Sequence, residues 1–283
     1  MGDTAINCLL CGKDMKPAYE VRGYWLYTCP NCSFKMIGCH TEAAINYSYD
    51  STYFQNSKYK DLIALSKEHE RRRKLLLQYA KGCIDLLDYG CASGEFVDYI
   101  RNDYNSWGCD ISKDAISIAK DKYPLNSKRY YTIEDIVKLG VKFDVVCVWD
   151  VIEHIENPEL LMKNLDILLK DKGVVLLSTP NIGSLFARIT KTRWPFMTPP
   201  EHLCFYSDKS MSYLAKKYYY EIKAWKTWGK WANVGFIMYK FNRVSSIKIP
   251  SVLLEKFRRG ALSRLRLYVP TRDVQYVVMK KLR

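Results

Sequence analysis

Residues 86–96 read LLDYGCASGEF, and this stretch decides the expected fold. An apolar strand over residues 84–88 closes on Gly90, and a helix begins soon after Gly94. Glycines at such a strand-to-helix turn let a ligand approach the backbone, and the helix start offers free N–H groups. The frame is G-x-x-x-G rather than the dinucleotide pattern G-x-G-x-x-G, so a pyrophosphate is disfavoured, and an ordinary βα turn is the alternative.

An acidic residue, Asp110, follows Gly90 by 20 positions, at the end of a second expected strand. A carboxylate there can accept hydrogen bonds from both ribose hydroxyls of a nucleoside. The glycine turn and Asp110 together therefore predict a nucleoside-containing ligand.

Strands and helices alternate around this turn. We expect strands over residues 84–88, 107–110, 129–133, 143–149 and 174–178, and helices over residues 96–101, 112–122, 158–169 and 208–219. Such a βαβ series predicts an α/β fold with a doubly wound parallel sheet. A helix over residues 58–80 is expected before the series. Strands over residues 220–228 and 273–279 are expected after it, on either side of a basic segment.

Several motifs in a fixed order resemble those of class I S-adenosylmethionine-dependent methyltransferases. They are the Asp88-x-Gly90-x-x-x-Gly94 turn, GCDIS at 108–112, FDVV at 143–146, VIEH at 151–154 and GVVLLSTPN at 173–181. The resemblance covers residues 80–230 and a closing strand at 273–281. It implies a seven-stranded Rossmann-like sheet whose last strand is antiparallel, and S-adenosylmethionine as the cofactor.

The same resemblance implies a set of cofactor-binding residues. The turn, with Asp88, Gly90, Cys91, Ala92 and Gly94, would face the methionine part. Asp110 would hold the ribose and Ile111 would stack near the adenine, whereas Glu134 or Asp135 would meet the adenine edge. Asp150 would border the transferred methyl group. Ala92 stands where the family more commonly has glycine.

Four cysteines near the N-terminus have metal-ligand spacing. Cys8-x-x-Cys11 and Cys29-x-x-Cys32 supply four soft ligands from two tight turns, which is typical of a structural zinc site. Four buried or redox-active thiols are the alternative, and Cys39-His40 are spare candidate ligands. We therefore expect a zinc-ribbon module over residues 1–40, a helical linker over 41–80 and a methyltransferase domain over 81–283, with a basic helical insertion at about 230–270.

Residues 199–207 read PPEHLCFYS and follow the fifth expected strand, so their loop overhangs the ligand-binding edge of the sheet. His202 is a candidate general base there, oriented by Glu201 or a neighbour. A structural histidine is the alternative, and His154 is the second candidate base. A similar Glu-His-Leu-x-x-x-Ser stretch occurs in sugar C-methyltransferases that carry an N-terminal Cys-x-x-Cys zinc domain. It occurs in looser form in methyltransferases of surface-glycan biosynthesis.

The net charge is +14 over 283 residues, and it is concentrated near the C-terminus. Residues 230–283 hold thirteen Lys or Arg against two acidic residues, which is +11 of that total. This favours an anionic partner. Residues 253–267 alternate apolar and cationic side chains at helical spacing. They predict an interfacial helix on an anionic membrane or a clamp for a phosphorylated substrate, or else a solvated surface helix. With no signal sequence and no long apolar run, we expect a cytoplasmic protein, with peripheral contact at the inner face of the membrane as a further option.

The leading functional hypothesis is methyl transfer from S-adenosylmethionine to a sugar hydroxyl, on a nucleotide sugar or on a lipid-linked or surface polysaccharide. A first alternative is C-methylation of a keto nucleotide sugar. A second is methylation of an rRNA or tRNA base, in which the zinc module binds RNA. A third, a non-catalytic zinc-ribbon adaptor, is disfavoured by the intact Asp88, Gly90, Gly94 and Asp110.

Overall fold

A computed structural model describes residues 6–38, 62–245, 249–259 and 265–282 of the chain. The spare candidate ligands Cys39 and His40 lie outside the described residues, as does the expected start of the helix at residue 58. Among the described residues, no helix is both long and apolar enough to cross a bilayer.

The main sheet has seven strands in the order β10-β11-β8-β7-β4-β5-β6. They are β4 (Asp85–Tyr89), β5 (Asn105–Asp110), β6 (Tyr130–Thr132), β7 (Phe143–Trp149), β8 (Leu169–Pro180), β10 (Tyr220–Asn233) and β11 (Arg266–Lys281). Only β11 runs antiparallel to its neighbours, so the expected Rossmann-like topology is confirmed. The chain progresses outward from β4 on one side and from β7 on the other. The switch point, where open α/β sheets bind ligands, therefore lies between these two strands.

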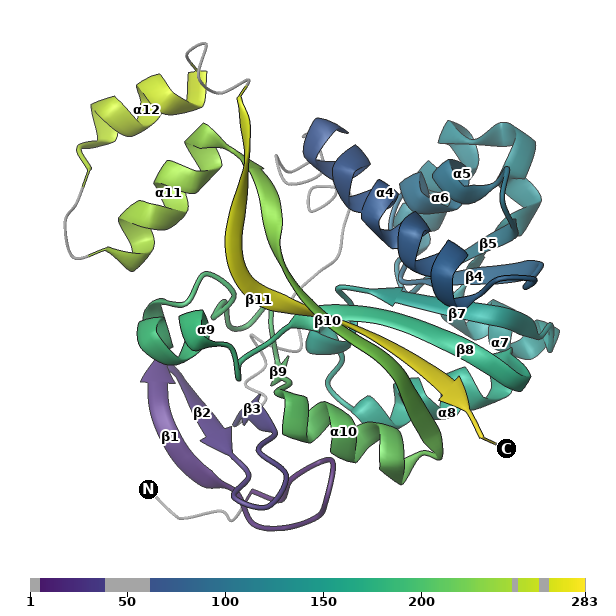
Figure 1. Ribbon diagram of the computed structural model, residues 1–283, viewed down its shortest axis with the longest axis horizontal. Coiled ribbons are helices and arrows are strands. Elements are labelled where there is room, and N and C mark those ends of the chain that lie inside the picture. Colours follow the sequence, from purple (N-terminus) through teal and green to yellow (C-terminus); the bar gives the residue numbers. More distant parts are fainter. Residues whose placement is uncertain (1–5, 39–61, 246–248, 260–264, 283) are drawn as a thin grey trace.

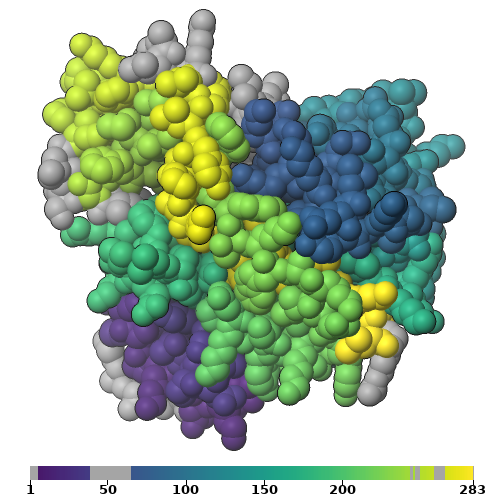
Figure 2. Space-filling model, viewed as in Figure 1, coloured from purple at the N-terminus to yellow at the C-terminus, as the bar shows by residue number. Residues whose placement is uncertain are grey.

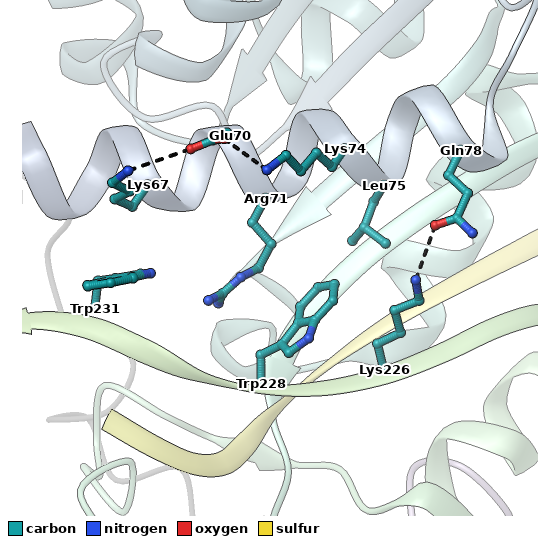
Figure 3. Close-up of a pocket in the computed structure, with 9 residues that line it drawn as sticks. All are labelled: Lys67, Glu70, Arg71, Lys74, Leu75, Gln78, Lys226, Trp228 and Trp231. Carbon is teal, nitrogen blue, oxygen red and sulfur yellow. Dashed lines mark hydrogen bonds and ion pairs between the residues drawn. The ribbon is translucent and has the colours of Figure 1, made fainter. Parts of the chain in front are cut away.

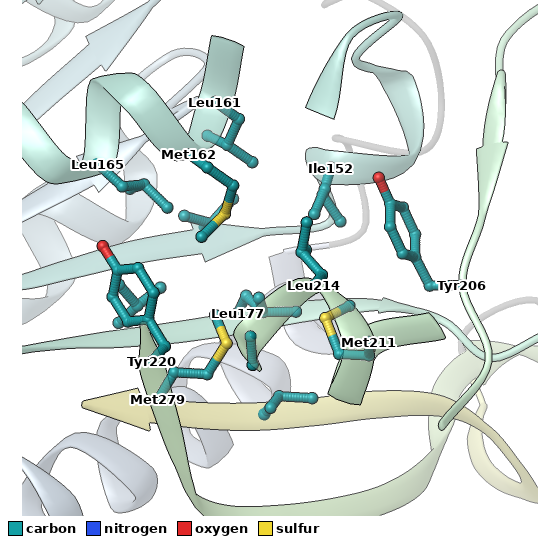
Figure 4. Packing of buried hydrophobic residues seen from close by; sticks show 14 of the residues in the cluster. Ile152, Leu161, Met162, Leu165, Leu177, Tyr206, Met211, Leu214, Tyr220 and Met279 are labelled. Atoms are coloured by element: carbon teal, nitrogen blue, oxygen red, sulfur yellow. The ribbon is translucent and has the colours of Figure 1, made fainter. Parts of the chain in front are cut away.

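Helices cover both faces of the sheet (Figure 1). One face carries α4 (Leu62–Tyr79), α5 (Glu95–Ile100) and α6 (Lys113–Lys122), and the other carries α7 (Ile133–Leu139), α8 (Pro158–Leu168) and α10 (Asp208–Lys217). Side chains of β7 alternate between the two layers, as the period of a strand requires. Val145 and Cys147 pack with α4 and α5, whereas Val146 and Val148 pack with α8 and α10. Figure 4 shows this second layer, where Leu161, Met162 and Met211 meet Leu177 and Met279 of the sheet.

A second sheet of four strands, ordered β1-β2-β3-β9, contains the N-terminal module. It comprises β1 (Lys16–Val21), β2 (Tyr24–Thr28), β3 (Lys35–Ile37) and β9 (Cys204–Phe205). Arg22 and Gly23 link β1 to β2 with φ of 54° and 84°, the left-handed values that a tight two-residue hairpin needs. Strand β9 comes from the 199–207 stretch, so the loop that carries the candidate general base leads directly into the sheet of the N-terminal module.

The basic C-terminal segment forms an arm. Strands β10 and β11 extend beyond the main sheet and carry α11 (Val234–Val244) and α12 (Ser251–Arg259) at their far end (Figure 1). Figure 2 shows this helical pair and the N-terminal module at the end of the molecule opposite α5 and α6.

One expectation about the basic segment was wrong. Helical spacing was predicted through residue 267, but β11 already begins at Arg266, because the alternation of Arg266 with its apolar neighbours also suits a strand. The remaining elements are α9 (Leu185–Thr190) and the 3₁₀ turns η1 (Pro124–Arg129), η2 (Ile152–His154) and η3 (Lys191–Arg193).

Candidate functional site

The glycine turn connects β4 to α5 at the switch point of the main sheet. Gly90 and Gly94 both have φ of +83°. A Cβ on Gly90 would lie 2.4 Å from Val151 Cγ2, and one on Gly94 would lie 2.9 Å from the Tyr130 ring. Both the backbone conformation and the space therefore require glycine. Ala92, between them, also has a positive φ, of 48°.

Asp110 closes the turn from the end of β5. Its Oδ2 accepts a hydrogen bond from the Ala92 amide at 2.9 Å, and its Oδ1 accepts one from the Ser112 amide at 2.9 Å. Burial raises the pKa of Asp110, and these amide donors oppose that rise. Each carboxylate oxygen keeps a second lone pair. Asp110 can therefore hold the turn and still accept ribose hydroxyls.

Asp88 lies beneath the turn with 3% of its surface exposed. Among the residues that the structure describes, no donor reaches its Oδ1 atom. Burial raises the pKa of Asp88 to about 7, with Arg72 opposing the rise and Asp110 adding to it. A buried carboxylate oxygen without a donor suits a cationic or hydrogen-bonding ligand group.

The other residues expected around the cofactor differ in what they offer. Ile111 is 74% exposed next to Asp110, so its side chain is available for stacking. Glu134 and Asp135 lie in the first turn of α7, a helix that the sequence analysis did not predict, and both are exposed. Cys91 Sγ would collide with a Cβ on Gly108, which means that the thiol packs under the turn against β5. Only the backbone of Cys91 can therefore face a ligand.

Asp150 stands just after β7 with φ of 55°, a strained value for a residue other than glycine. Its Oδ2 pairs with Arg72 Nη2 at 3.1 Å and Lys230 Nζ at 3.4 Å, and its Oδ1 accepts a hydrogen bond from Ser178 Oγ at 3.1 Å. Arg72 and Lys230 come from α4 and β10, and neither is recognisable as a site residue from the sequence, since each is one cation among several in its segment.

Two histidines, His154 and His202, meet beside Glu153. The rings of His154 and His202 are 4.7 Å apart between centroids, nearly at right angles. His154 Nδ1 lies 2.7 Å from the Glu201 carbonyl oxygen, and His202 Nδ1 lies 2.7 Å from that of Phe196. A carbonyl oxygen can only accept, so both Nδ1 atoms carry the proton. Each neutral ring then presents Nε2 as a base, and the residue that orients His202 is Phe196, while Glu201 orients His154.

Glu153 completes this cluster. It is 2% exposed, and its Oε2 accepts a hydrogen bond from Thr179 Oγ1 at 2.9 Å. Burial, helped by the charge of Asp150, raises the pKa of Glu153 to about 8. Donor atoms of Glu153, His154 and His202 all lie within 4.8 Å of one another, a set that could share a proton or hold a metal ion.

The loop that carries His202 is held from two sides. The Leu203 amide donates to the Glu153 carbonyl oxygen at 2.9 Å, and the Ile37 amide donates to the Leu203 carbonyl oxygen at 2.9 Å. The next residue, Cys204, pairs with Met36 in the β3–β9 ladder. The N-terminal module therefore buttresses the histidine loop through backbone hydrogen bonds.

The four cysteines of the N-terminal module converge. Cys8 Sγ and Cys32 Sγ are 3.5 Å apart, Cys11 Sγ and Cys29 Sγ are 3.4 Å apart, and all four sulfurs lie within 4.8 Å of one another. A zinc ion with sulfur ligands at about 2.3 Å would separate them by about 3.8 Å. The hydrogen bond shared by Cys8 and Cys32 lowers the pKa of Cys8 and raises that of Cys32, so these two sulfurs share one proton.

The two cysteine turns also share a backbone pattern. The Gly12 amide donates to the Cys8 carbonyl oxygen and the Ser33 amide to that of Cys29. Gly12 and Ser33, each directly after the second cysteine of its pair, have φ of 71° and 62°. Two matching turns present the four sulfurs to one point, which is the arrangement that a tetrahedral metal site requires.

The chain is similar in sequence to known methyltransferases. The model of a family described as a methyltransferase domain matches residues 55–224. Malonyl-[acyl-carrier protein] O-methyltransferase 2 of Ilyobacter polytropus is 29% identical over 133 residues, which is 45% of this chain and 51% of that protein. Ubiquinone biosynthesis O-methyltransferase of Glaesserella parasuis is 28% identical over 106 residues, which is 34% of this chain and 45% of that protein. The chain thus spans about half the length of these curated relatives.

Solved structures show the same fold. A SAM-dependent methyltransferase from Archaeoglobus fulgidus aligns with a TM-score of 0.51 at 20% identity, over 82% of this chain and all of that one. Magnesium protoporphyrin IX methyltransferase from Synechocystis, solved with bound SAH, aligns with a TM-score of 0.53 at 15% identity, over 85% of this chain and all of that one.

Proposed function

Because the chain belongs to the methyltransferase domain family, we propose that it transfers the methyl group of S-adenosylmethionine to a sugar hydroxyl. The acceptor sugar would be part of a nucleotide sugar, or of a lipid-linked or surface polysaccharide. The named relatives support oxygen as the accepting atom, since they are O-methyltransferases. Detection of a methylated sugar together with S-adenosylhomocysteine tests the proposal.

The residues of the glycine turn fit this cofactor. The buried Asp88 Oδ1, which lacks a donor among the described residues, suits the ammonium of the methionine part. Asp110 suits the ribose, and the exposed Ile111 suits a face of the adenine. When bound, S-adenosylmethionine supplies a methyl group on a sulfonium, which an aligned nucleophile can displace.

The position and tautomer of His202 are the observation that supports a hydroxyl acceptor. A sugar hydroxyl is a weak nucleophile at neutral pH and needs a base to take its proton. The Phe196 carbonyl fixes His202 with Nδ1 protonated, which leaves Nε2 basic, and the buried Glu153 stands in the same cluster. A C-methyl acceptor would use the same base, so product analysis has to separate the two reactions.

We expect Asp110→Ala to weaken S-adenosylmethionine binding more than tenfold. That factor is about 1.4 kcal/mol, the net contribution of a hydrogen-bonded carboxylate, and the variant also loses the bonds from the amides of Ala92 in the turn and of Ser112 before α6. Calorimetric titration measures the change, with Asp114→Ala as the matched control, an exposed acid in the first turn of α6. Equal affinity of the Asp110 variant and the wild type would remove Asp110 from the cofactor site.

Asp88 predicts a pH dependence for cofactor binding. Burial raises its pKa to about 7, so the carboxyl is protonated below that pH and ionised above it. A cationic ligand group prefers the carboxylate. Affinity should therefore rise about tenfold per pH unit below pH 7 and level off above it. Titrations between about pH 5.5 and 8 measure this slope, and Asp88→Asn should flatten it. A slope that survives in Asp88→Asn would assign the titration to another group.

We also propose that Cys8, Cys11, Cys29 and Cys32 bind one structural zinc ion. Four thiolates fill a tetrahedral shell and leave no open position for a substrate, so the ion would stabilise the module rather than react. Convergence of the four sulfurs and the two matching turns support the proposal.

A further inference from the structure

Helix α4 and strand β10 enclose a groove of about 600 Å³ on the face of the main sheet that carries α4 (Figure 3). Six of its side chains are cationic or aromatic, namely Lys67, Arg71, Lys74, Lys226, Trp228 and Trp231. The remaining lining residues are Glu70, Leu75 and Gln78.

The groove has an excess of positive charge. Lys67, Arg71 and Lys74 are spaced at i, i+4 and i+7, so they share one face of α4, and Lys226 approaches from β10. Among the described residues, Glu70 is the acidic residue of the lining, and it pairs with Lys67 at 3.9 Å and with Lys74 at 2.9 Å. Glu68, beside the groove on the same helix, pairs with Arg71 at 3.2 Å. Four cations against these two carboxylates leave a net charge of +2, which favours an anionic ligand.

The tryptophans add flat surfaces to this charge. Trp228 packs against the Arg71 guanidinium, 5.0 Å from the ring centroid, and Trp231 packs against Tyr268 at 5.6 Å. Figure 3 shows Arg71 extending from α4 into the space between the two indoles. Both indoles remain partly exposed. A flat ring and a phosphate group are the two chemical features that such a lining recognises together.

The groove borders the methyl-transfer site. Arg71 lines the groove, whereas its neighbour Arg72 pairs with Asp150. On the opposite wall, the Gly229 carbonyl oxygen accepts a hydrogen bond from Arg71 at 2.9 Å, and the adjacent Lys230 also pairs with Asp150. A ligand held in the groove could therefore extend along α4 and β10 toward Asp150.

We propose that this groove binds the nucleoside diphosphate part of a nucleotide-sugar acceptor. The base would stack on Trp231, since Arg71 and Tyr276 already pack against Trp228. The phosphates would pair with the cations of α4 and β10, so the sugar would point toward the methyl-transfer site. A volume of about 600 Å³ suits one nucleotide. The inference rests on the proposed function, and it narrows the acceptor from any glycan to a nucleotide sugar.

The test is calorimetric titration of the purified full chain with uridine, guanosine and thymidine diphosphates, followed by intrinsic tryptophan fluorescence. We expect at least one of them to bind, to quench the fluorescence and to bind more weakly as salt is raised. Trp231→Ala and Lys74→Glu should each weaken that binding about tenfold or more. Affinity for S-adenosylmethionine, measured on the same samples, should stay within about twofold.

Lys163→Glu is the matched control for Lys74→Glu. Lys163 is an exposed lysine on α8 that pairs with an acid four residues earlier, as Lys74 does, but it lies on the opposite face of the sheet. The Lys163→Glu variant should bind nucleotide with the affinity of the wild type. Equal weakening by both lysine variants, or no effect of either groove variant, would overturn the proposal. So would a wild type that binds S-adenosylmethionine but none of the three nucleotides, or an RNA oligonucleotide that displaces the nucleotide at lower concentration. A wild type that does not bind S-adenosylmethionine would instead refute the proposed function itself.

Discussion

Replacing His202 with alanine should lower kcat by roughly 10²–10⁴ and leave the affinity for S-adenosylmethionine nearly unchanged. His202 lies in the loop before β9, in ring contact with His154, and the Phe196 carbonyl fixes its Nδ1 proton. In the proposed mechanism, its Nε2 is the base that would remove the hydroxyl proton of the acceptor. Steady-state kinetics with saturating S-adenosylmethionine measure the loss, and a binding titration shows that the cofactor site is intact.

His202→Asn separates chemistry from folding. An asparagine amide can still donate to the Phe196 carbonyl oxygen, but it cannot take a proton. This variant should melt near the wild-type temperature and be as inactive as His202→Ala. His154→Ala removes the bond to the Glu201 carbonyl oxygen, so we expect its main effect on the melting temperature. If His202→Ala retained full kcat on the true acceptor, the histidine would leave the mechanism. An amine, which attacks with its own lone pair, would then become the better acceptor.

Removal of the proposed zinc ion from the cysteine cluster should lower the stability of the protein strongly. Structural zinc contributes on the order of 10 kcal/mol to small zinc-dependent folds at neutral pH. Metal analysis should give about one zinc per chain, and Cys29→Ser should lower the melting temperature far more than it lowers cofactor affinity. Because the Ile37 amide and strand β3 hold the histidine loop, kcat should fall as well.

Cys83→Ser is the control for this experiment, since Cys83 is a half-buried thiol outside the cluster. It should change neither the zinc content nor kcat. A protein purified without metal, whose N-terminal strands nonetheless show protected amides, would contradict the zinc assignment. An unchanged kcat in metal-depleted Cys29→Ser would contradict the buttressing of the loop by the module.

The main sheet could be predicted because its signals are local. Apolar runs such as residues 143–149 are long enough to identify buried strands, and glycine turns mark where they end. The short helix α7 was missed, because seven residues from Ile133 to Leu139 carry fewer than two full apolar repeats. The end of the basic segment was misjudged for a similar reason, since alternation around Arg266 fits a strand as well as a helix.

Contacts between distant segments lie beyond any local pattern. Strand β9 has only two residues, Cys204 and Phe205. So short a segment has no hydrophobic pattern from which its pairing with β3 could be predicted. The pairing of Asp150 with Arg72 and Lys230 joins segments 78 and 80 residues away. The cysteine spacing and the Asp88–Asp110 pattern could be found in the sequence, because the chemistry itself dictates those residue types and spacings.

The most direct test of the account is transfer of a labelled methyl group. The purified full chain is incubated with S-adenosylmethionine carrying a deuterated methyl group and a mixture of nucleotide sugars, with His202→Asn in parallel. Mass spectrometry then locates the label. The account predicts a labelled methyl ether on the sugar of one nucleotide sugar, an equal amount of S-adenosylhomocysteine, and neither product with His202→Asn. Three results, each from wild-type protein that binds S-adenosylmethionine, would contradict this prediction. They are label on a sugar carbon, label on RNA, and no label on any added acceptor.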